Sequence, residues 1–449
     1  MTTYSVQMKS NRSSKLWMIL RVCLFWVCTS SLATADLIKL ETDTAFDSVY
    51  LFHDTDSPLI TVGLTVMAGE VDVKGPEGLS HYLEHLMYWH ADNLDNQQAH
   101  ARGGNAWVNG ILTSYFNESE RSDLDDMLEF TRRLFSEPKL DASFMLRERS
   151  VVEREYDLRV SENPEWRVYT SIRRTLYDDL PLSRSVIGTP ESIQSLTLQQ
   201  ARDFHQEFYH PVNSVLFVAG NLDQAETVAL IEAKFAELQP GEHHKADWRE
   251  ATIEGESDTT TRFTESQAKF ERLVYMTLSE WPDSESPIKN WYTLRMLLRV
   301  LDSALDGGVA KPLRMENFVL RSFEIELHSV LSNYFELLMF AEPDKGVTLQ
   351  QASDTIATTL RELASAGIPS KTLERIRKRM LQTETRNSDI VQANYIRLAE
   401  QLNSGLEPLT TKEHLEHIEA VSLEEVNELL RSLADPKRRS IAFVEPKGE

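Results

Sequence analysis

The feature that most constrains the fold is a group of two histidines and a glutamate within five residues, His81-Tyr82-Leu83-Glu84-His85. In a helix, residues three and four apart lie on one face, so both imidazoles and the carboxylate project to the same side. Two imidazoles one turn apart can bind a tetrahedral zinc ion, and Glu84 is placed to take a proton from water beside it. The alternative is a helix that carries two histidines by chance. The motif therefore predicts a helix and, on that helix, a metal site.

The first 35 residues have the features of a separate segment. A basic start is followed by an apolar run at 16–28 and by the small-residue sequence Ala33-Thr34-Ala35. This order is typical of a secretory signal peptide, so we expect residues 1–35 to be removed and the chain to be exported to a bacterial periplasm or secreted. Arg21 interrupts the apolar run, which leaves an uncleaved anchor as the alternative, although the run is short for a membrane span.

Composition restricts the chemistry of the site and the class of partner. Both cysteines, Cys23 and Cys28, lie in the predicted leader, so a metal in the remaining chain must be held by histidine and carboxylate. The chain has 47 basic and 70 acidic residues and a formal net charge of −23. This charge argues against nucleic acid as a partner, because binding nucleic acid needs clustered cations. The acidity either serves solubility or marks an acidic cavity that attracts basic peptides, and we prefer solubility.

Hydrophobic patterning divides the rest of the chain into two α+β halves. We predict an N-terminal zinc-binding domain at 36–239, a polar linker at 240–266 and a C-terminal domain at 267–449. The second half contains no H-x-x-E-H sequence. Its His414 and His417, three residues apart, are interpreted as helix-surface residues.

A weak internal repeat supports this division. Residues 195–218 read as a helix, a proline (Pro211) and a buried strand, and residues 422–444 repeat that order around Pro436. The repeat predicts two homologous halves, each with a mixed or antiparallel sheet and helices packed on one side of it. We expect the two halves to enclose a cavity.

A zinc site that hydrolyses a substrate needs a third protein ligand and one open position. Because cysteine is excluded, the candidates are carboxylates on a charged helix that we predict from residue 141 to about residue 161. Glu148 and Glu155 are seven residues apart and share a face, and Glu153 lies between them. Spacing alone does not choose among the three, and a charged helix of this kind is usually a solvated face.

The chain resembles the insulinase, or pitrilysin, family of zinc metallopeptidases, which includes the subunits of the mitochondrial processing peptidase. The order H-x-x-E-H is the inverted-zincin signature. In this family the signature is followed about seventy residues later by a ligand glutamate, with another glutamate seven residues before that ligand. The further matches are Ala68-Gly69-Glu70, Gly78-Leu79-Ser80, and Asn105-Ala106-Trp107 followed by Thr113 and Tyr115. The resemblance covers essentially the whole chain after the leader, most closely residues 45–220.

This resemblance implies a role for each matched residue of the metal site. His81, His85 and Glu155 would bind one Zn²⁺ per chain, since Glu155 lies seventy residues after His85. Glu84 would be the general base, and Glu148 would be a second catalytic glutamate that orients a ligand or the attacking water.

The resemblance also implies substrate-binding residues, with one departure. Asn105 and Ala106 would hold the substrate backbone at a sheet edge, and Arg314 would bind a substrate carbonyl. The family pairs that arginine with a tyrosine seven residues later, where this chain has Arg321. Relatives can take a missing anchor from a partner chain, so we expect a homodimer or a heterodimer with a homologous chain. The alternative is that the anchor is local and is one of Arg321, Phe323 and Tyr334.

Two functions are consistent with these observations. The first is an exported zinc metalloendopeptidase that hydrolyses peptide bonds in peptides or unfolded polypeptide segments. The second is a non-catalytic or partner-dependent binding subunit of a heterodimeric peptidase, which the absent tyrosine favours. The presence of Glu84 argues against the second, because a purely structural subunit has no need of a general base.

Overall fold

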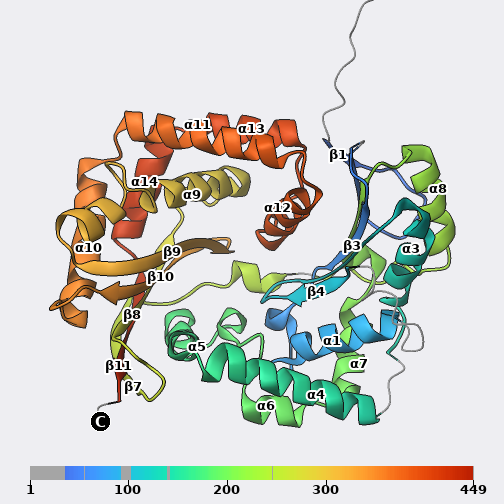
Figure 1. Cartoon of the computed structure of the whole chain (residues 1–449), viewed down its shortest axis with the longest axis horizontal. Helices are drawn as coiled ribbons and strands as arrows, with labels where there is room; N and C mark the ends of the chain where they lie inside the picture. Colours follow the sequence, from blue (N-terminus) through green and yellow to red (C-terminus); the bar gives the residue numbers. More distant parts are fainter. Residues whose placement is uncertain (1–35, 55, 93–102, 139–141, 245, 448–449) are drawn as a thin grey trace, which may run out of the picture.

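A computed structural model describes residues 36–54, 56–92, 103–138, 142–244 and 246–447. The chain forms two α+β halves that face each other (Figure 1). The predicted leader lies outside the described residues. No helix in the described part of the chain has the length and apolar character that crossing a membrane requires.

The first half contains a six-stranded mixed sheet with the strand order β1-β2-β6-β3-β5-β4. β2 and β6 are parallel, and the other neighbours are antiparallel. β3 and β6 are buried along their whole length, which accounts for their nearly continuous apolar sequences. The strands are β1 (Asp36–Lys39), β2 (Ser48–His53), β3 (Ile60–Val66), β4 (Asn105–Val108), β5 (Thr113–Ser119) and β6 (Ser214–Gly220).

The second half contains a five-stranded sheet with the order β7-β11-β8-β10-β9. β7 and β11 are parallel and the remaining neighbours are antiparallel, so the sheet repeats the pattern β2-β6-β3-β5-β4 of the first half. The predicted duplication is therefore present, with β6 and β11 in equivalent places. The strands are β7 (Ser257–Glu265), β8 (Arg272–Glu280), β9 (Leu320–Leu331), β10 (Tyr334–Pro343) and β11 (Arg438–Pro446).

The helices also follow the same order in both halves, and five of them begin with a capping box, in which a Thr or Ser side chain caps the first turn. The first half has α1 (Leu79–Asp92), α3 (Leu124–Arg133), α4 (Ala142–Tyr156), α5 (Pro164–Tyr177), α6 (Pro190–Ser195), α7 (Leu198–Phe208) and α8 (Gln224–Phe235). The second has α9 (Pro287–Leu301), α10 (Leu349–Ala366), α11 (Ser370–Asn387), α12 (Val391–Asn403), α13 (Thr411–Ala420) and α14 (Leu423–Ala434). π-helical turns follow α4 at Asp157–Ser161 and precede β9 at Lys311–Glu316.

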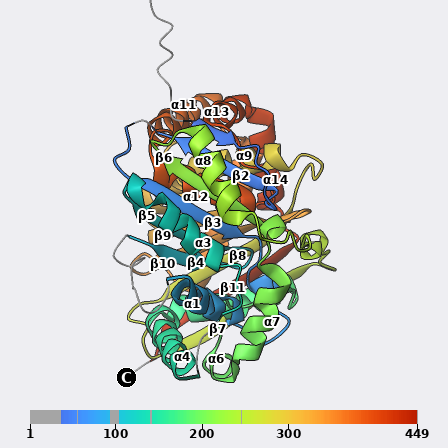
Figure 2. The same ribbon diagram turned by 90° about the vertical axis from the view of Figure 1, so that its right-hand side faces the viewer.

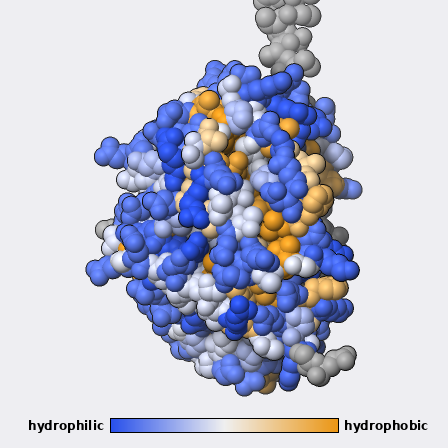
Figure 3. All heavy atoms as spheres, turned by 90° about the vertical axis from the view of Figure 1, so that its left-hand side faces the viewer, coloured by the Kyte–Doolittle hydropathy of each residue, from blue (hydrophilic) through white to orange (hydrophobic). Residues whose placement is uncertain are grey.

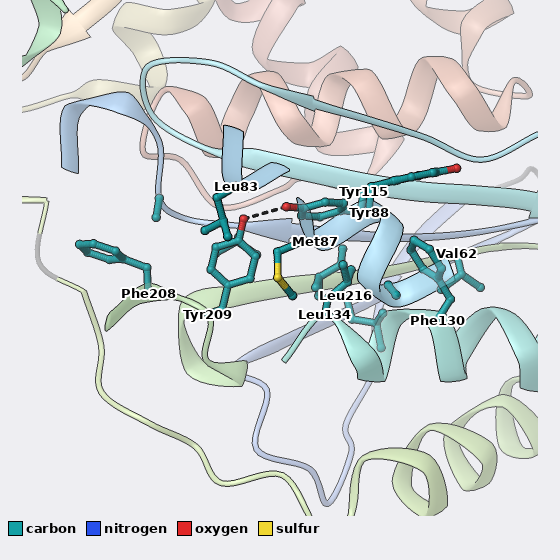
Figure 4. Packing of buried hydrophobic residues seen from close by; sticks show 14 of the residues in the cluster. Val62, Leu83, Met87, Tyr88, Tyr115, Phe130, Leu134, Phe208, Tyr209 and Leu216 are labelled. Atoms are coloured by element: carbon teal, nitrogen blue, oxygen red, sulfur yellow. Dashed lines mark hydrogen bonds between the residues drawn. The ribbon is translucent and has the colours of Figure 1, made fainter. Parts of the chain in front are cut away.

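Helix α1 is held by the core of the first half, which lies between the sheet and the half's own helices. Leu83 and Met87 of α1 are fully buried in this core. Beside them, the hydroxyls of Tyr115 on β5 and Tyr209 share a hydrogen bond of 2.8 Å (Figure 4). Burying side chains of this size contributes roughly 1.5–3 kcal/mol each. The core therefore fixes the orientation of the helix that carries the histidine motif.

The opposite face of the first sheet is covered by α12, a helix of the second half (Figures 1 and 2). Tyr395 and Leu398 of α12 are buried against Phe52 and Phe217 of the sheet. A Cβ atom at Gly63 would lie 2.7 Å from the Tyr395 ring, so only glycine allows this approach. Helices of the first half pack on one side of its sheet, as predicted. The other face of this sheet is covered by α12, which belongs to the second half.

The arrangement is reciprocal, because α5 of the first half covers the second sheet. Val168 and Ile172 of α5 are buried with Val274 and Met276 of β8 in one cluster. α5 and α12 hold equivalent places in the element order of the two halves. Each half therefore lends one helix to the other, which fixes the two halves relative to each other.

The predicted linker at 240–266 is too long. Residues 257–265 form β7, which pairs with β11 along its whole length, so the connection between the sheets is 240–256. β7 is an edge strand with exposed polar side chains, and that composition resembles a linker in the sequence. Arg249 in the connection donates a hydrogen bond of 2.8 Å to the carbonyl of Asn403 in α12.

Candidate metal centre and cavity

The start of α1 is anchored by a buried carboxylate. Glu70 accepts hydrogen bonds from the backbone N–H of Gly78 at 3.1 Å and from the hydroxyl of Ser80 at 2.6 Å. Arg184 forms an ion pair with the same carboxylate at 3.2 Å. Burial raises the pKa of Glu70 to about 7, and these three partners oppose the shift. Sequence analysis gave Glu70 no role of its own, and the structure shows that it positions the first turn of the motif helix.

The predicted metal ligands come together from α1 and α4. Nε2 of His81 lies 3.5 Å from Oε2 of Glu155, and Nε2 of His85 lies 3.7 Å from Oε1 of the same carboxylate. The two imidazole rings are 4.9 Å apart and nearly perpendicular, at 89°. Ligand atoms about 2.0–2.1 Å from a tetrahedral zinc ion are separated by roughly 3.3 Å. The observed separations are close to that value, so the three side chains fit the ion.

Hydrogen bonding around the histidines supports this fit. Nδ1 of His85 lies 3.2 Å from Oε2 of the buried Glu148. A proton on Nδ1 donated to Glu148 leaves the lone pair of Nε2 directed toward Glu155. Oε2 of Glu155 is buried and lies 3.5 Å from Nε2 of His81 and 3.3 Å from Nη2 of Arg159.

Glu84 and Glu155 are both close enough to compete as the third ligand, because the ligating atoms of His81, Glu84 and His85 all lie within 4.8 Å. Glu84 is farther from the imidazole, with 4.0 Å between its Oε2 and Nε2 of His81. Glu155 faces both imidazoles at shorter distances, so the geometry favours Glu155 as ligand and Glu84 as the neighbouring base. Glu153, the remaining candidate, does not line the cavity.

The two carboxylates differ in charge state as well as in distance. Burial raises the pKa of Glu84 to about 7, which suits a group that takes up and releases a proton near neutral pH. The hydrogen bond with His81 lowers the pKa of Glu155 to about 2, which keeps it an anionic ligand. Burial lowers the pKa of His81. Burial also acts to lower the pKa of His85, but its hydrogen bond to Glu148 and the nearby carboxylates outweigh burial and raise it.

The site opens into a cavity of about 1360 Å³ between the halves. Asn105 and Ala106 of β4 line this cavity, as predicted for residues that hold a substrate backbone. β4 pairs with β5 and is the last strand of its sheet. In the described part of the chain no strand pairs with the other edge of β4, which can therefore pair with an extended peptide. The side chain of Asn105 accepts a hydrogen bond of 2.9 Å from the N–H of Ala106.

The predicted anchor in the second half does not reach the cavity. Arg314 lies in the π-helical turn before β9, is exposed and is not a lining residue. The cavity is lined by the other end of β9, near His328. From Leu320 to His328 the strand extends roughly 26 Å, which separates Arg314 from the site. The local alternatives also fail to line it: Arg321, which pairs with Glu342 at 2.8 Å, Phe323 and Tyr334.

Helix α9 of the second half lines the cavity as α1 does, but with side chains that differ from the histidine motif. Trp291, Leu294 and Arg295 of α9 repeat the spacing of His81, Glu84 and His85 of α1, and both sets line the cavity. Arg295 pairs with Glu400 of α12 at 2.5 Å and with Glu384 of α11 at 3.8 Å. A guanidinium cannot bind a metal ion, so this position holds an ion pair instead.

His414, interpreted from the sequence as a helix-surface residue, is fully buried in the second half. The hydroxyl of Tyr292 lies 2.7 Å from its Nδ1, and a carboxylate oxygen of Glu384 lies 3.3 Å from its Nε2. His417 is half-buried and stacks on the ring of Tyr292. The spacing of the two histidines did not reveal this burial, because it does not show that α9 and α11 cover the side of α13 that carries them. Among the described residues, His81, Glu84 and His85 are the only three metal-ligating side chains whose ligand atoms all lie within 4.8 Å of one another.

The charges that line the cavity are balanced. Among the described residues, five glutamates and five arginines line it: Glu84, Glu148, Glu155, Glu326, Glu400, Arg159, Arg173, Arg184, Arg295 and Arg299. The outer face of the second half is mostly hydrophilic, with apolar side chains gathered in one part of it (Figure 3). These observations support the interpretation that the acidity of the chain serves solubility rather than an acidic cavity.

Comparisons of the sequence with protein families identify both halves. Residues 48–190 match the model "Insulinase (Peptidase family M16)", and residues 195–380 match the model "Peptidase M16 inactive domain". An uncharacterized zinc protease of Mycobacterium leprae is 28% identical over 406 residues, which cover 86% of each chain. The zinc protease YmfH of Bacillus subtilis is 27% identical over 158 residues, 35% of this chain and 36% of that protein. A fission-yeast protein named "Probable mitochondrial-processing peptidase subunit beta" is 27% identical over 220 residues, 46% of this chain and 47% of that protein.

Solved structures share the two-half fold. A protease of Helicobacter pylori superimposes with a TM-score of 0.77 at 18% identity, covering 92% of this chain and 100% of that one. The first half of the periplasmic protease PqqL of Escherichia coli superimposes with a TM-score of 0.73 at 16% identity, covering 91% of this chain and 92% of that one. At these identities the likeness establishes the fold and not the activity.

Proposed function

The chain belongs to the insulinase family of peptidases, peptidase family M16, and we propose that it is a zinc metalloendopeptidase that cleaves peptides or unfolded polypeptide segments. The observation that carries this proposal is the arrangement of His81, His85 and Glu155 at distances that suit one zinc ion. Glu84 stands beside these ligands with its pKa raised by burial to about 7. A family member that had lost catalysis would not need to keep a base in that place.

The roles of the residues in peptide hydrolysis follow from their positions. A zinc ion held by His81, His85 and Glu155 would supply Lewis acidity at the cavity wall. Glu84 accepts the proton that the attacking water gives up and returns it to the nitrogen of the leaving amine. Glu148 keeps the ring of His85 in the required orientation through its 3.2 Å contact with Nδ1.

The substrate lies along β4 in this proposal. The open edge of β4 offers N–H and C=O groups to an extended peptide, which fixes the register of the peptide through its main chain. Main-chain pairing requires an unfolded segment, and the cavity between the halves limits what can enter. Peptides and unfolded segments are therefore the substrate class that the geometry favours.

Hydrolysis of a fluorogenic peptide library by the zinc-loaded full chain tests the proposal. We expect activity that a chelator removes and added zinc restores. Glu84→Gln should abolish activity while one zinc per chain remains bound. Glu153→Gln, on α4 and outside the cavity, is the matched control and should behave like wild type. Zinc-loaded protein that cleaves no peptide, alone or with a homologous chain, would refute the proposal.

A second candidate function is a partner-dependent subunit, for which the position of Arg314 outside the cavity is the specific observation. One relative is named as a subunit of a mitochondrial processing peptidase, and a homodimer or heterodimer of this chain is proposed on the same basis. Size-exclusion chromatography and peptidase assays with and without a homologous chain decide between the candidates. A monomer whose rate and mass do not change on adding the homologue excludes the partner-dependent function.

We also propose that the protein is exported to the periplasm or secreted. The basic, apolar and small-residue regions of residues 1–35 support this proposal. Amino-terminal sequencing of the protein from fractionated cells is the test, and we expect a chain that begins at Asp36 outside the cytoplasm. A full-length chain in the cytoplasmic fraction would contradict it.

A further inference from the structure

We propose that Arg159 is a further catalytic residue, whose guanidinium binds the carbonyl oxygen of the scissile peptide bond. This inference rests on the proposed peptidase function and answers a question that the site leaves open. The expected carbonyl anchors of the second half, Arg314 and Arg321, do not line the cavity. A donor for the substrate carbonyl must therefore come from another element.

Arg159 lies on the wall that carries the metal ligands. Its Nη2 atom is 3.3 Å from Oε2 of Glu155, and the same oxygen is 3.5 Å from Nε2 of His81. The side chain lines the cavity and is 68% exposed. The guanidinium thus reaches the edge of the metal site, and most of the side chain is accessible from the cavity or from solvent.

The backbone beneath Arg159 is irregular in a way that is common at functional sites. The helix α4 continues into the π-helical turn Asp157–Ser161, closed by a hydrogen bond of 2.9 Å from the N–H of Glu162 to the carbonyl of Asp157. Such single π-turns are often found where a side chain must be placed in an active site. This turn carries Arg159 and exposes its neighbour Leu158, which also lines the cavity.

The other arginines of the cavity wall form ion pairs with carboxylates outside the metal ligands or belong to the second half. Arg173 and Arg184 pair with carboxylates that are only 1% exposed, those of Glu336 and Glu70. Arg295 is held between Glu400 and Glu384 in the second half. Arg299 also belongs to α9 of the second half.

Among the described residues, the one ion pair of Arg159 is with Glu155. Glu155 is the carboxylate that would bind the metal ion. Arginine has five N–H donors, so a single contact with one carboxylate oxygen leaves donors for a substrate.

The chemistry of peptide hydrolysis gives these donors a role. When the water oxygen bonds to the carbonyl carbon, the π electron pair of the C=O bond moves to the carbonyl oxygen, and the water proton goes to Glu84. The C–N bond then breaks as that electron pair re-forms the carbonyl, and Glu84 gives its proton to the amine nitrogen. A guanidinium beside the oxygen stabilises the negative charge that develops in the first step, and loss of one such donor typically costs about 10²–10³-fold in kcat.

The test compares Arg159→Gln and Arg159→Lys with a matched control, Arg154→Gln, which changes an exposed arginine of α4 outside the cavity. We expect kcat of Arg159→Gln to fall about 100-fold with little change in KM, because the interaction forms mainly in the transition state. Arg159→Lys should recover part of the rate, and the control should match wild type. Zinc affinity, measured by competition with a chromophoric chelator, should be the same in all four proteins.

Binding of a phosphinic peptide, a stable tetrahedral mimic of the attacked carbonyl, provides a readout without turnover. Calorimetry should show an affinity loss for Arg159→Gln that parallels the loss in kcat. Unchanged kcat and unchanged phosphinate affinity would overturn the proposal. So would a zinc affinity that falls in step with kcat, since Arg159 would then only orient Glu155. If wild type cleaves nothing, the peptidase function fails, and equal phosphinate affinities of wild type and Arg159→Gln overturn the role of Arg159 separately.

Discussion

Both halves bring a carboxylate of one helix against the cavity-lining helix of the same half, but the groups that face the carboxylate differ. In the first half, His81 and His85 on α1 face Glu155 on α4, an arrangement that suits a bound metal ion. In the second half, Arg295 on α9 takes the place of His85 in the spacing and pairs with Glu384 on α11. In the proposed function, the link between α1 and α4 needs a zinc ion from solution, whereas the link between α9 and α11 carries its positive charge on Arg295. The comparison shows that the two halves share one scaffold and differ in a few side chains at the cavity wall. In the proposed function, these side chains and not the fold separate a catalytic half from a supporting one.

The largest expected effect comes from removing the third ligand of the first half. Glu155→Gln should abolish peptidase activity and weaken zinc binding by more than the 10–100-fold typical of residues outside the ligand set. Arg295→Gln, which removes the cation that pairs with Glu384 in the second half, should leave zinc affinity unchanged. Zinc titration and peptide hydrolysis measure both. Equal losses of zinc affinity in the two variants would show that the halves are not divided in this way.

Helix α5 packs on the second sheet and α12 on the first sheet. A substitution in α12 should therefore destabilise the packing of the first half. Tyr395 of α12 is buried on the first sheet, with its ring 5.2 Å from that of Phe217. Tyr395→Ala should lower the free energy of unfolding by about 3–5 kcal/mol. Tyr395→Phe, which loses only the hydroxyl bonded to Ser114 at 3.0 Å, should cost about 1 kcal/mol. Urea unfolding measures these values, and similar small losses in both variants would argue against the exchanged packing.

A buried histidine gives the first half a sensitivity to acid. Burial lowers the pKa of His205 on α7 to about 4, while its Nε2 lies 2.8 Å from the carbonyl of Leu134. The unfolded chain takes up a proton first, so stability is lost as pH falls from about 6.5 to 4, on the order of 3 kcal/mol. His205→Gln keeps an N–H donor and should remove this part of the pH dependence. Urea unfolding between pH 4 and 7 is the measurement, and an unchanged slope in the variant would contradict it.

Zinc should stabilise the protein through the first half alone. Binding to the native state at a free zinc concentration one hundred times Kd contributes about 2.7 kcal/mol. Arg295→Gln should cost about 1 kcal/mol, since its partner Glu400 is partly exposed. The two effects should add, because they act on different helix pairs. Unfolding of both proteins with zinc and with chelator measures this, and a zinc effect that disappears in Arg295→Gln would show that the halves share one cross-link.

The smallest expected effect concerns the opposite pH response of the second half. Burial acts to lower the pKa of His328 on β9, but hydrogen bonds with Glu326 and Glu336 outweigh burial and raise it to about 9. Arg173 of α5 faces the same cluster and pairs with Glu336 at 3.8 Å. The stabilisation is complete below about pH 6.5 and is lost as pH rises through 9.

The side chain of His328 is 43% exposed, so water screens its interactions and we expect about 1 kcal/mol. His328→Gln should therefore be less stable than wild type at pH 6 and equal to it above pH 9. Urea unfolding at pH 6 and at pH 9.5 measures the difference. A difference that grows toward high pH would have the wrong sign for this assignment.

Local sequence patterns predicted the fold class and the helix that carries the histidine motif. The spacing of His81 and His85 placed both rings on one helix face, and the helix–proline–strand repeat predicted two homologous α+β halves, which the structure contains. The choice of Glu155 over Glu153 came only from the family resemblance, because spacing on one helix does not show where a second helix crosses it. The distances of 3.5 and 3.7 Å now give that choice a physical basis.

Features that depend on distant contacts could not be predicted. The apolar positions Val168 and Ile172 indicate an amphipathic helix, but nothing in their spacing shows that α5 packs on the sheet of the other half. The polar sequence of β7 resembled a linker because an edge strand with exposed faces has the same composition. The family resemblance implied that Arg314 binds substrate in the cavity, and the sequence alone does not show that the other end of β9 lines it.

Anomalous diffraction from crystals of the zinc-loaded protein, recorded at the zinc absorption edge, tests the central claim most directly. We predict one peak per chain, bonded to Nε2 of His81, Nε2 of His85 and a carboxylate oxygen of Glu155, with Glu84 beside the ion and not bonded to it. A peak coordinated by Glu84 in place of Glu155, a peak in the second half, or no peak at full zinc loading would contradict the account.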